Sequence, residues 1–433
     1  MTAREKLSGH RGHELGRSPF GATARSITAA LVHGAVAITW LAFGMDWAPG
    51  RWVPVHLFTL GVLTNLVLVF SEHFGRTLTR SDDQRIRWQP YVVNAGVVMV
   101  VAGLPLGLTW LVAVGATVVT AVVLVSYWRL RTMRRSSVGA RFVWIVRAYE
   151  RAHGAFVHGA ILGLLLGLGV VQGAWYASAR VAHLHINVLG WGGLTLLATL
   201  VFFGPTLTRT RIVKGADDRA AQALRRGATG LTVAVLLLLA TGVGGEAAVV
   251  VRVLAAAAMA VFAWAATVAC IPVGQAARGA NPSATRWPVI ALSTWFPVVA
   301  WADVVVIATG SWRFLDALGL AVMLGVLVQT IATVLTYLAP MLRSRTFAGR
   351  DLVLARFEAG ASTRTIAFNL GVAAVVAAAL VGPGAGVAGA MATRVGWVLV
   401  IAALAHLAVS GLRPVAVEDD TPATSAVAKR YRS

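Results

Sequence analysis

Residues 185–209 read HINVLGWGGLTLLATLVFFGPTLTR. The segment begins with a histidine, ends with an arginine and contains no other ionisable side chain. A helix rises 1.5 Å per residue, so about 20 apolar residues cross the hydrocarbon core of a bilayer, which is about 30 Å thick. The segment is therefore predicted to be a transmembrane helix that carries a histidine near one end.

The composition of the whole chain points to the same environment. Of its 433 residues, 58% are hydrophobic and only 13% are charged, and the mean hydropathy is +0.74. A soluble domain of this length is far more polar. We therefore expect an all-α membrane protein, embedded in the lipid bilayer of the cell membrane, with about twelve transmembrane helices. The twelve apolar runs are 24–45, 52–72, 89–106, 108–128, 148–171, 183–204, 222–243, 247–271, 287–309, 314–339, 363–382 and 390–411.

The distribution of positive charge predicts the orientation of these helices. The net charge is +21, and all but five of the 38 Lys and Arg residues lie in the two terminal tails and in alternate loops. This is the positive-inside pattern, and it places both termini in the cytoplasm. The basic composition therefore indicates topology and not a nucleic-acid partner. The five exceptions, predicted to face outward, are Arg51, Arg180, Arg252, Arg313 and Arg394.

An internal repeat links spans 2 and 6. Residues 56–80 read HLFTLGVLTNLVLVFSEHFGRTLTR, and 10 of the 25 positions are identical to residues 185–209 without a gap. The preceding spans agree, since span 1 carries Val-His-Gly-Ala at 32–35 and span 5 carries the same four residues at 157–160. Each repeat therefore contributes a pair of histidines.

A third, weaker copy lies in span 10, where six residues match the second copy at a constant offset of 135 and Leu320 replaces the histidine. The chain is thus predicted to contain three four-helix units. The predicted organisation is a cytoplasmic basic tail (1–23), a transmembrane domain (24–412) with repeat units at about 24–140, 141–280 and 281–412, and a disordered cytoplasmic tail (413–433).

The repeated histidines are the candidate site. His56 and His185 are predicted to lie in the outer third of the membrane, and His33 and His158 near mid-depth. Neutral imidazole suits iron and copper, so we expect these four residues to ligate a metal, as haem b with copper as a further possibility. His183 precedes His185 by two residues, or about 200° around a helix, so only one of the two faces a given site.

Other polar residues within or beside the spans have two readings each. Asp303 in span 9 either pairs with an arginine such as Arg313 or belongs to a proton path. His153, at the inner end of span 5, either relays protons or pairs at the interface. Arg51 and Arg180, at the outer ends of spans 2 and 6, are placed to meet haem propionates. Interhelical hydrogen bonding is the alternative role for all the intramembrane histidines.

Twelve spans in three units, with histidines near the outer ends of spans 2 and 6, resemble the membrane subunit of the haem-copper oxidase superfamily. In that family the second, sixth and tenth helices are pseudo-equivalent and carry haem or copper ligands. This chain departs from the family at two places, because span 10 has Leu320 and span 7 (222–243) has no histidine. The full ligand set of a proton-pumping oxidase is therefore not expected.

Residues 56–80 and residues 183–212, HLHINVLGWGGLTLLATLVFFGPTLTRTRI, are more closely similar to NnrS-type proteins. They also resemble the membrane domain of actinobacterial copper oxidases and nitrite reductases. The resemblance implies twelve helices, haem with possible copper, and a role connected to nitric oxide. No cupredoxin domain follows the spans, so a cupredoxin or other electron donor is expected to be a separate protein.

The functional expectation is a membrane protein that binds haem, and possibly copper, in redox or nitric oxide metabolism. If the protein is an enzyme, it is an oxidoreductase. Two alternatives remain open. The same histidines would suit a copper-binding or copper-handling protein without haem, and internal repeats with intramembrane polar residues are also typical of small-molecule transporters.

Overall fold

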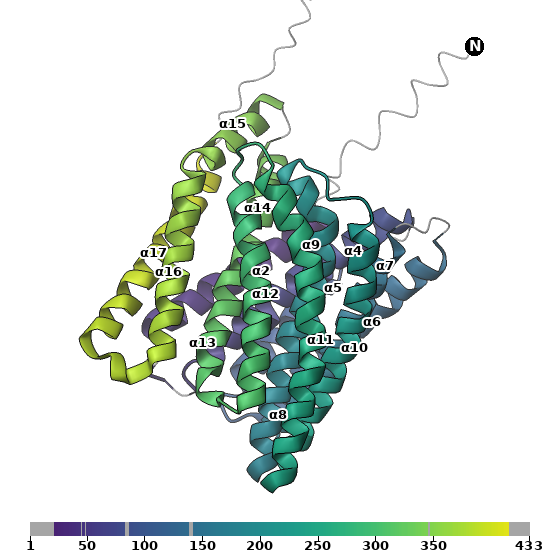
Figure 1. Ribbon diagram of the computed structural model, residues 1–433. Helices are drawn as coiled ribbons and strands as arrows, with labels where there is room; N and C mark the ends of the chain where they lie inside the picture. Colours follow the sequence, from purple (N-terminus) through teal and green to yellow (C-terminus); the bar gives the residue numbers. More distant parts are fainter. Residues whose placement is uncertain are drawn as a thin grey trace, which may run out of the picture. The chain divides into compact units, whose positions relative to one another are not determined.

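In the computed structural model of the chain, residues 21–44, 46–47, 49–82, 86–137, 142–344 and 347–414 are described. These residues are almost entirely helical and contain no strand, which confirms the all-α prediction for this part of the chain. Most of the two predicted tails, residues 1–20 and 415–433, lies outside the described residues. The α-helices, shown in Figure 1, are α2 (Gly21–Phe43), α3 (Trp52–His56), α4 (Thr64–Thr79), α5 (Gln89–Gly103), α6 (Thr109–Arg135), α7 (Val143–Gly167), α8 (Gly173–His185), α9 (Leu194–Thr208), α10 (Ala216–Ala240), α11 (Gly245–Arg278), α12 (Arg286–Thr309), α13 (Leu315–Leu320), α14 (Gln329–Arg343), α15 (Phe347–Glu358), α16 (Ala361–Val381) and α17 (Gly386–Leu412).

The described residues include 10 helical segments that are long and apolar enough to cross a membrane. Each of the twelve predicted spans falls on a helix. The two predicted spans that lie outside this set have identifiable reasons. Helix α5 has only 15 residues, and α7 carries charged residues in its first half, at Arg147, Glu150 and Arg151.

Three of the spans are interrupted by π-helix. The segments are η1 (Leu57–Leu63), η2 (Ile186–Gly193) and η5 (Ala321–Val328). Each begins at the residue after His56, His185 or Leu320. In a π-helix each backbone hydrogen bond spans one more residue than in an α-helix, and such segments are frequently found at functional sites. The hydropathy pattern did not predict these segments.

Helices α4 and α9 end in the same unusual way. The residue after each, Arg80 or Arg209, has a positive φ, of 53° and 55° respectively. No other non-glycine residue in the described ranges has a positive φ. Both arginines close the repeated Thr-Leu-Thr-Arg sequence, so the two copies share a left-handed helix end as well as their residues.

The chain divides into two compact units. Unit 1 comprises residues 1–206, 211–276 and 293–318. Its helices approach closely at glycines, and in α5 and α6 a Cβ on Gly115 would lie only 2.7 Å from the carbonyl oxygen of Gly96. Likewise a Cβ on Gly230 of α10 would lie 2.7 Å from the carbonyl oxygen of Ala258 on α11. Small residues at helix contacts are typical of membrane bundles, where close packing provides much of the association energy.

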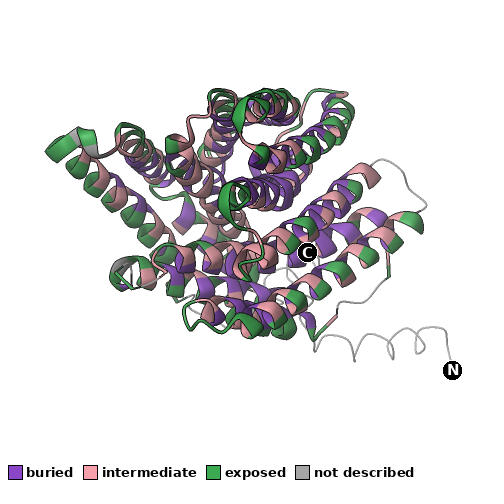
Figure 2. Ribbon diagram, turned by 90° about the horizontal axis from the view of Figure 1, so that it is seen from below, coloured by how far each residue is buried: buried purple, intermediate pink, exposed green. Residues whose placement is uncertain are grey.

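Unit 2 comprises residues 207–210, 277–292 and 319–433. Figure 1 shows α16 and α17 as an antiparallel pair, and a Cβ on Gly371 would lie 2.6 Å from the carbonyl oxygen of Gly396. The short helix α15, which the sequence did not predict, buries Val353 and Phe357 in a cluster with Ala284. In Figure 2 the buried residues lie on the sides of helices that face other helices, and exposed residues lie on the outward sides.

Candidate functional site

His56 is the last residue of α3, and it is oriented by its own helix and by a tryptophan. Its Nδ1 lies 2.9 Å from the carbonyl oxygen of Trp52. A carbonyl can only accept a hydrogen bond, so Nδ1 carries the proton and Nε2 retains a lone pair. The imidazole also stacks on the Trp52 indole, with ring centroids 3.9 Å apart and planes inclined by 21°.

His183 on α8 is held by α7. Its Nδ1 lies 2.8 Å from the carbonyl oxygen of Gly159, which again leaves the lone pair on Nε2. The ring lies over Gly163, where a Cβ would be only 2.6 Å from the imidazole Cε1. Asn187, one turn further along, donates from Nδ2 to the carbonyl oxygen of His183 at 2.8 Å. Because a Cβ at position 163 would collide with the His183 ring, glycine is required there for the observed position of the ring.

The rings of His56 and His183 lie close to each other. Their centroids are 6.4 Å apart and their planes are inclined by 18°. Each ring donates its Nδ1 proton to a backbone carbonyl, the second-shell arrangement that fixes the tautomer of most metal-ligating histidines. The structure thus brings His56, the first residue of one repeated segment, close to His183, which lies two residues before the other, and each has an available Nε2.

His185, the sequence equivalent of His56, has a different environment. Its Nδ1 bonds to the carbonyl oxygen of Val181 at 2.7 Å, and its Nε2 lies 3.1 Å from both carboxylate oxygens of Asp303 on α12. His185 is 1% exposed and Asp303 is 6% exposed. Both ring nitrogens are committed, so His185 links α8 to α12. Asp303 therefore pairs with His185, a partner that neither of the two sequence readings, an arginine such as Arg313 or a proton path, had named.

The other histidine pair, His33 and His158, is not brought together with this one. His33 is buried and bonds through Nδ1 to the carbonyl oxygen of Ala29 at 2.8 Å. Its ring packs on η1, because a Cβ on Gly61 would lie 2.5 Å from two of its atoms. His158 is exposed and bonds through Nδ1 to the carbonyl oxygen of Gly154 at 2.8 Å.

His153 is fully enclosed and also uses both ring nitrogens. Nδ1 lies 2.7 Å from the carbonyl oxygen of Tyr149, and Nε2 lies 3.2 Å from the Ser126 hydroxyl on α6. The ring meets the Trp191 indole edge-on, with centroids 4.7 Å apart. These contacts connect α7 with α6 and η2 and account for the residue without a cofactor.

The two arginines that the sequence associated with propionates lie in exposed positions. Arg51 Nη1 forms an ion pair with Asp316 Oδ2 at 2.9 Å, and both side chains are about two-thirds exposed, at 67% and 65%. Arg180 is exposed. Asp316 was not singled out in the sequence, because an acidic residue at a span end carries no repeat or spacing signal.

Two buried carboxylates were also missed. Glu72 accepts from Gln89 at 2.8 Å and pairs with Arg129 at 3.2 Å, and Glu150 pairs with Arg134. Glu72 and Glu150 are only 2% and 5% exposed. An acidic residue inside an apolar run was the available signal. Since both carboxylates are compensated by cations, they need no ligand.

The positions of the side chains show which of them could ligate one metal ion together. Among the described residues, no group of three or more His, Cys, Asp or Glu side chains is placed to hold a metal ion. A pair is available, in His56 and His183. An ion bound to two imidazole nitrogens at about 2.0–2.1 Å each separates the ring centroids by roughly 6 Å, close to the observed 6.4 Å. The pair is therefore close enough to share one metal, whose remaining ligands would come from a porphyrin or from solution.

Comparison with protein families and with curated proteins gives no match to this chain.

Proposed function

We propose that this protein is an integral membrane protein that binds one redox metal, as haem b iron or as copper, through His56 and His183. The observation that supports it is the meeting of these two rings across spans 2 and 6, each with Nδ1 anchored on a backbone carbonyl and Nε2 available. Such a metal supplies one-electron exchange and binding of small molecules such as nitric oxide. The proposed role is redox or nitric oxide metabolism.

The chain's own residues prepare this site before any metal is bound. The carbonyl oxygens of Trp52 and Gly159 fix the tautomers of His56 and His183. The Trp52 indole covers one face of the His56 ring, and Gly163 admits the His183 ring against α7. Preorganised ligands lose little conformational entropy when the metal binds.

The proposal includes twelve membrane spans in three four-helix units. It is supported by π-helices that begin at the same repeat position in spans 2, 6 and 10, and by the left-handed Arg80 and Arg209. The proposed resemblance to haem-copper oxidase subunits and NnrS-type proteins rests on the sequences of residues 56–80 and 183–212. We place the protein in the cell membrane with both termini in the cytoplasm and the histidine pair toward the outer face, where a separate cupredoxin or other electron donor would reach it.

The first experiment purifies the full-length protein in detergent and combines a reduced-minus-oxidised absorption spectrum with a metal count. A Soret band with one iron per chain identifies haem, whereas copper without a Soret band identifies copper alone. The variants His56→Ala and His183→Ala should each lose the metal. The matched control is His158→Ala, because His158 also bonds through Nδ1 to its own helix but is exposed.

If the wild-type protein, supplied with haem and with copper during expression, contains neither metal while remaining folded, the histidine pair has another purpose. Equal metal content in His56→Ala, His183→Ala and His158→Ala would also overturn it, because the metal would then lie elsewhere.

A further inference from the structure

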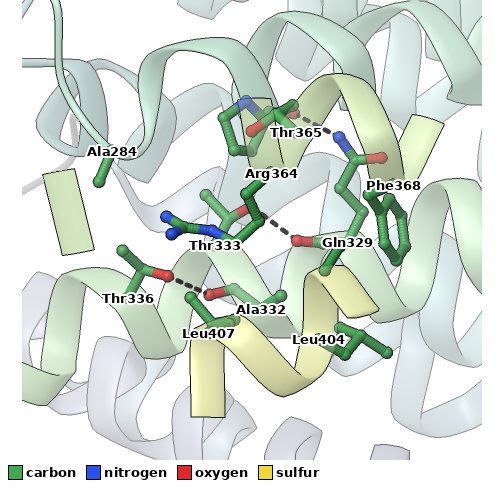
Figure 3. Close-up of a pocket in the computed structure, with 12 residues that line it drawn as sticks. Ala284, Gln329, Ala332, Thr333, Thr336, Arg364, Thr365, Phe368, Leu404 and Leu407 are labelled. Carbon is green, nitrogen blue, oxygen red and sulfur yellow. Dashed lines mark hydrogen bonds between the residues drawn. The ribbon is translucent and has the colours of Figure 1, made fainter. Parts of the chain in front are cut away.

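A small cavity lies within unit 2, and its lining is mostly apolar, with a group of polar side chains on α14 and α16. Gln329, Thr333 and Thr336 follow one another on one face of α14, and Thr365 and Arg364 come from α16. Figure 3 shows these side chains around the space. The cavity volume is about 40 Å³, and a cavity needs about 10–15 Å³ for each water molecule it holds.

The threonines offer lone pairs to this cavity. Each hydroxyl donates its proton to the backbone carbonyl four residues earlier, at 2.6 Å for Thr333, 2.7 Å for Thr336 and 2.8 Å for Thr365. All three side chains are buried. With the protons committed, the oxygens can still accept hydrogen bonds.

Gln329 adds an acceptor without a partner. Its Nε2 donates to the carbonyl oxygen of Pro288 at 3.2 Å, which fixes the orientation of the amide. Within the described residues, Oε1 is buried and has no hydrogen-bond partner, and Gln329 as a whole is 3% exposed. A buried acceptor of this kind is normally satisfied by water or a ligand.

The equivalent residue in the first repeat shows how an amide at this position is satisfied elsewhere in the chain. With the offsets that align the three copies, Gln329 corresponds to Asn65 in span 2. The Asn65 amide exchanges two hydrogen bonds with Asn94, of 2.9 and 3.1 Å, and is satisfied by the protein. At the corresponding position in unit 2, Gln329 lines a cavity and its amide oxygen has no such partner.

We propose that this cavity binds small neutral molecules that donate hydrogen bonds, with water as the resident ligand. The lining presents several acceptor oxygens, which disfavours an anion. Arg364 is also part of the lining, and its positive charge, held by hydrogen bonds to Phe357 and His406, disfavours a cation nearby. The unpartnered Gln329 oxygen disfavours an apolar molecule. Nothing in this site depends on the histidine pair in unit 1.

The test measures water access to the cavity in the full-length protein in lipid nanodiscs. The variants Thr333→Cys and Thr336→Cys are treated with methyl methanethiosulfonate, and modification is followed by peptide mass spectrometry. Thiols react as thiolates, which need water, so we expect modification at least about tenfold faster than at the native Cys270. Cys270 is fully buried and serves as the internal control, with Leu327→Cys as a buried control within unit 2.

Two further experiments test whether the Gln329 side-chain oxygen accepts a hydrogen bond from the bound molecule. In the Thr336→Cys background, Gln329→Leu should slow modification several-fold and Gln329→Asn should not. Ethanol should protect the thiol, whereas acetonitrile, which is equally small but donates no hydrogen bond, should not. If both reporter variants react no faster than Cys270, or if ethanol and acetonitrile act equally, the proposal is wrong.

Discussion

Residues 52–79 and 173–208 share the same order of helical segments and differ in the chemistry of their histidines. In each, an α-helix ends at a histidine, a π-helix follows and a second α-helix completes the span. Yet His56 keeps an available Nε2 close to a second imidazole, whereas Asp303 occupies the Nε2 of its equivalent, His185. The repeated residue fixes the position on the helix, and the neighbouring helix determines the role.

The helices beside the two segments differ in register. In the first copy the ring of His33 packs on Gly61, whereas in the second copy Ala155 packs on the equivalent Gly190. His158, the sequence equivalent of His33, lies three residues after Ala155 and is exposed. Three residues are nearly one helical turn. Helix α7 therefore packs about one turn away from the register that α2 uses, and His183 occupies the space beside it.

The largest expected difference between the two copies is in the free energy of unfolding lost when the histidine is replaced by alanine. His185→Ala leaves the Asp303 carboxylate buried without its partner, and breaking a buried pair in this way costs about 3–5 kcal/mol. His56→Ala removes a stacked ring and a hydrogen bond within its own helix, which together cost about 1–2 kcal/mol. Denaturant unfolding in detergent micelles measures both. Equal losses would show that Asp303 does not depend on His185.

A double variant sharpens this result. In His185→Leu/Asp303→Leu no charge is left buried, so most of the stability lost in His185→Ala should return. If the double variant is as unstable as the single one, the hydrogen bonds of the pair contribute more than we infer.

The packing of His33 on η1 gives the next largest effect. Gly61→Ala places a Cβ against the His33 ring and should destabilise the protein by about 1–3 kcal/mol. Adding His33→Ala makes room for this Cβ and should recover part of the loss. The control is Gly154→Ala, because no atom lies within 4 Å of a Cβ at that glycine. Thermal unfolding checks the three variants, and no recovery in the double variant would contradict the contact.

Gly163→Ala should act on the metal more than on the fold. The added Cβ would displace the His183 ring, and disturbing the support of a ligand typically lowers metal affinity about 10–100-fold. Gly154→Ala on the same helix is again the control. Titration of the metal-free protein with copper or haem gives both affinities. Unchanged affinity in Gly163→Ala would place the ligand elsewhere.

The smallest effect should come from Trp52. Trp52→Leu removes the stacking on His56, which is worth about 0.5–1.5 kcal/mol beyond the buried area. Trp52→Phe keeps an aromatic face and should retain most of it. A double-mutant cycle with His56→Ala isolates the coupling, and a coupling of zero would mean that the stack does not orient the imidazole.

The helices followed from the sequence because runs of about 20 apolar residues have few alternatives in a membrane. The π-segments did not follow, since hydropathy is insensitive to one extra residue in a turn. Helix α15 was missed because its buried residues, Val353 and Phe357, stand among charged ones.

The site was predicted in type and only partly in detail. The repeat pointed to His56 and His185 as the ligands, whereas the structure brings His183 to His56 and pairs His185 with Asp303. Residues about 200° apart on a helix cannot be ranked without the partner helices. The partners are Gly159 and Asp303, which lie 24 and 118 residues away in the chain. No local pattern carries that information.

The most direct test of the account counts the imidazoles bound to the metal. Pulsed electron paramagnetic resonance on protein labelled with ¹⁵N-histidine, in the cupric or ferric low-spin state, reports coordinated ring nitrogens. We predict two histidines in the wild-type protein and in His158→Ala, one or none in His56→Ala and in His183→Ala. Two coordinated histidines that persist in His183→Ala, or none in the wild-type protein, would contradict the assignment of His56 and His183 as the ligand pair.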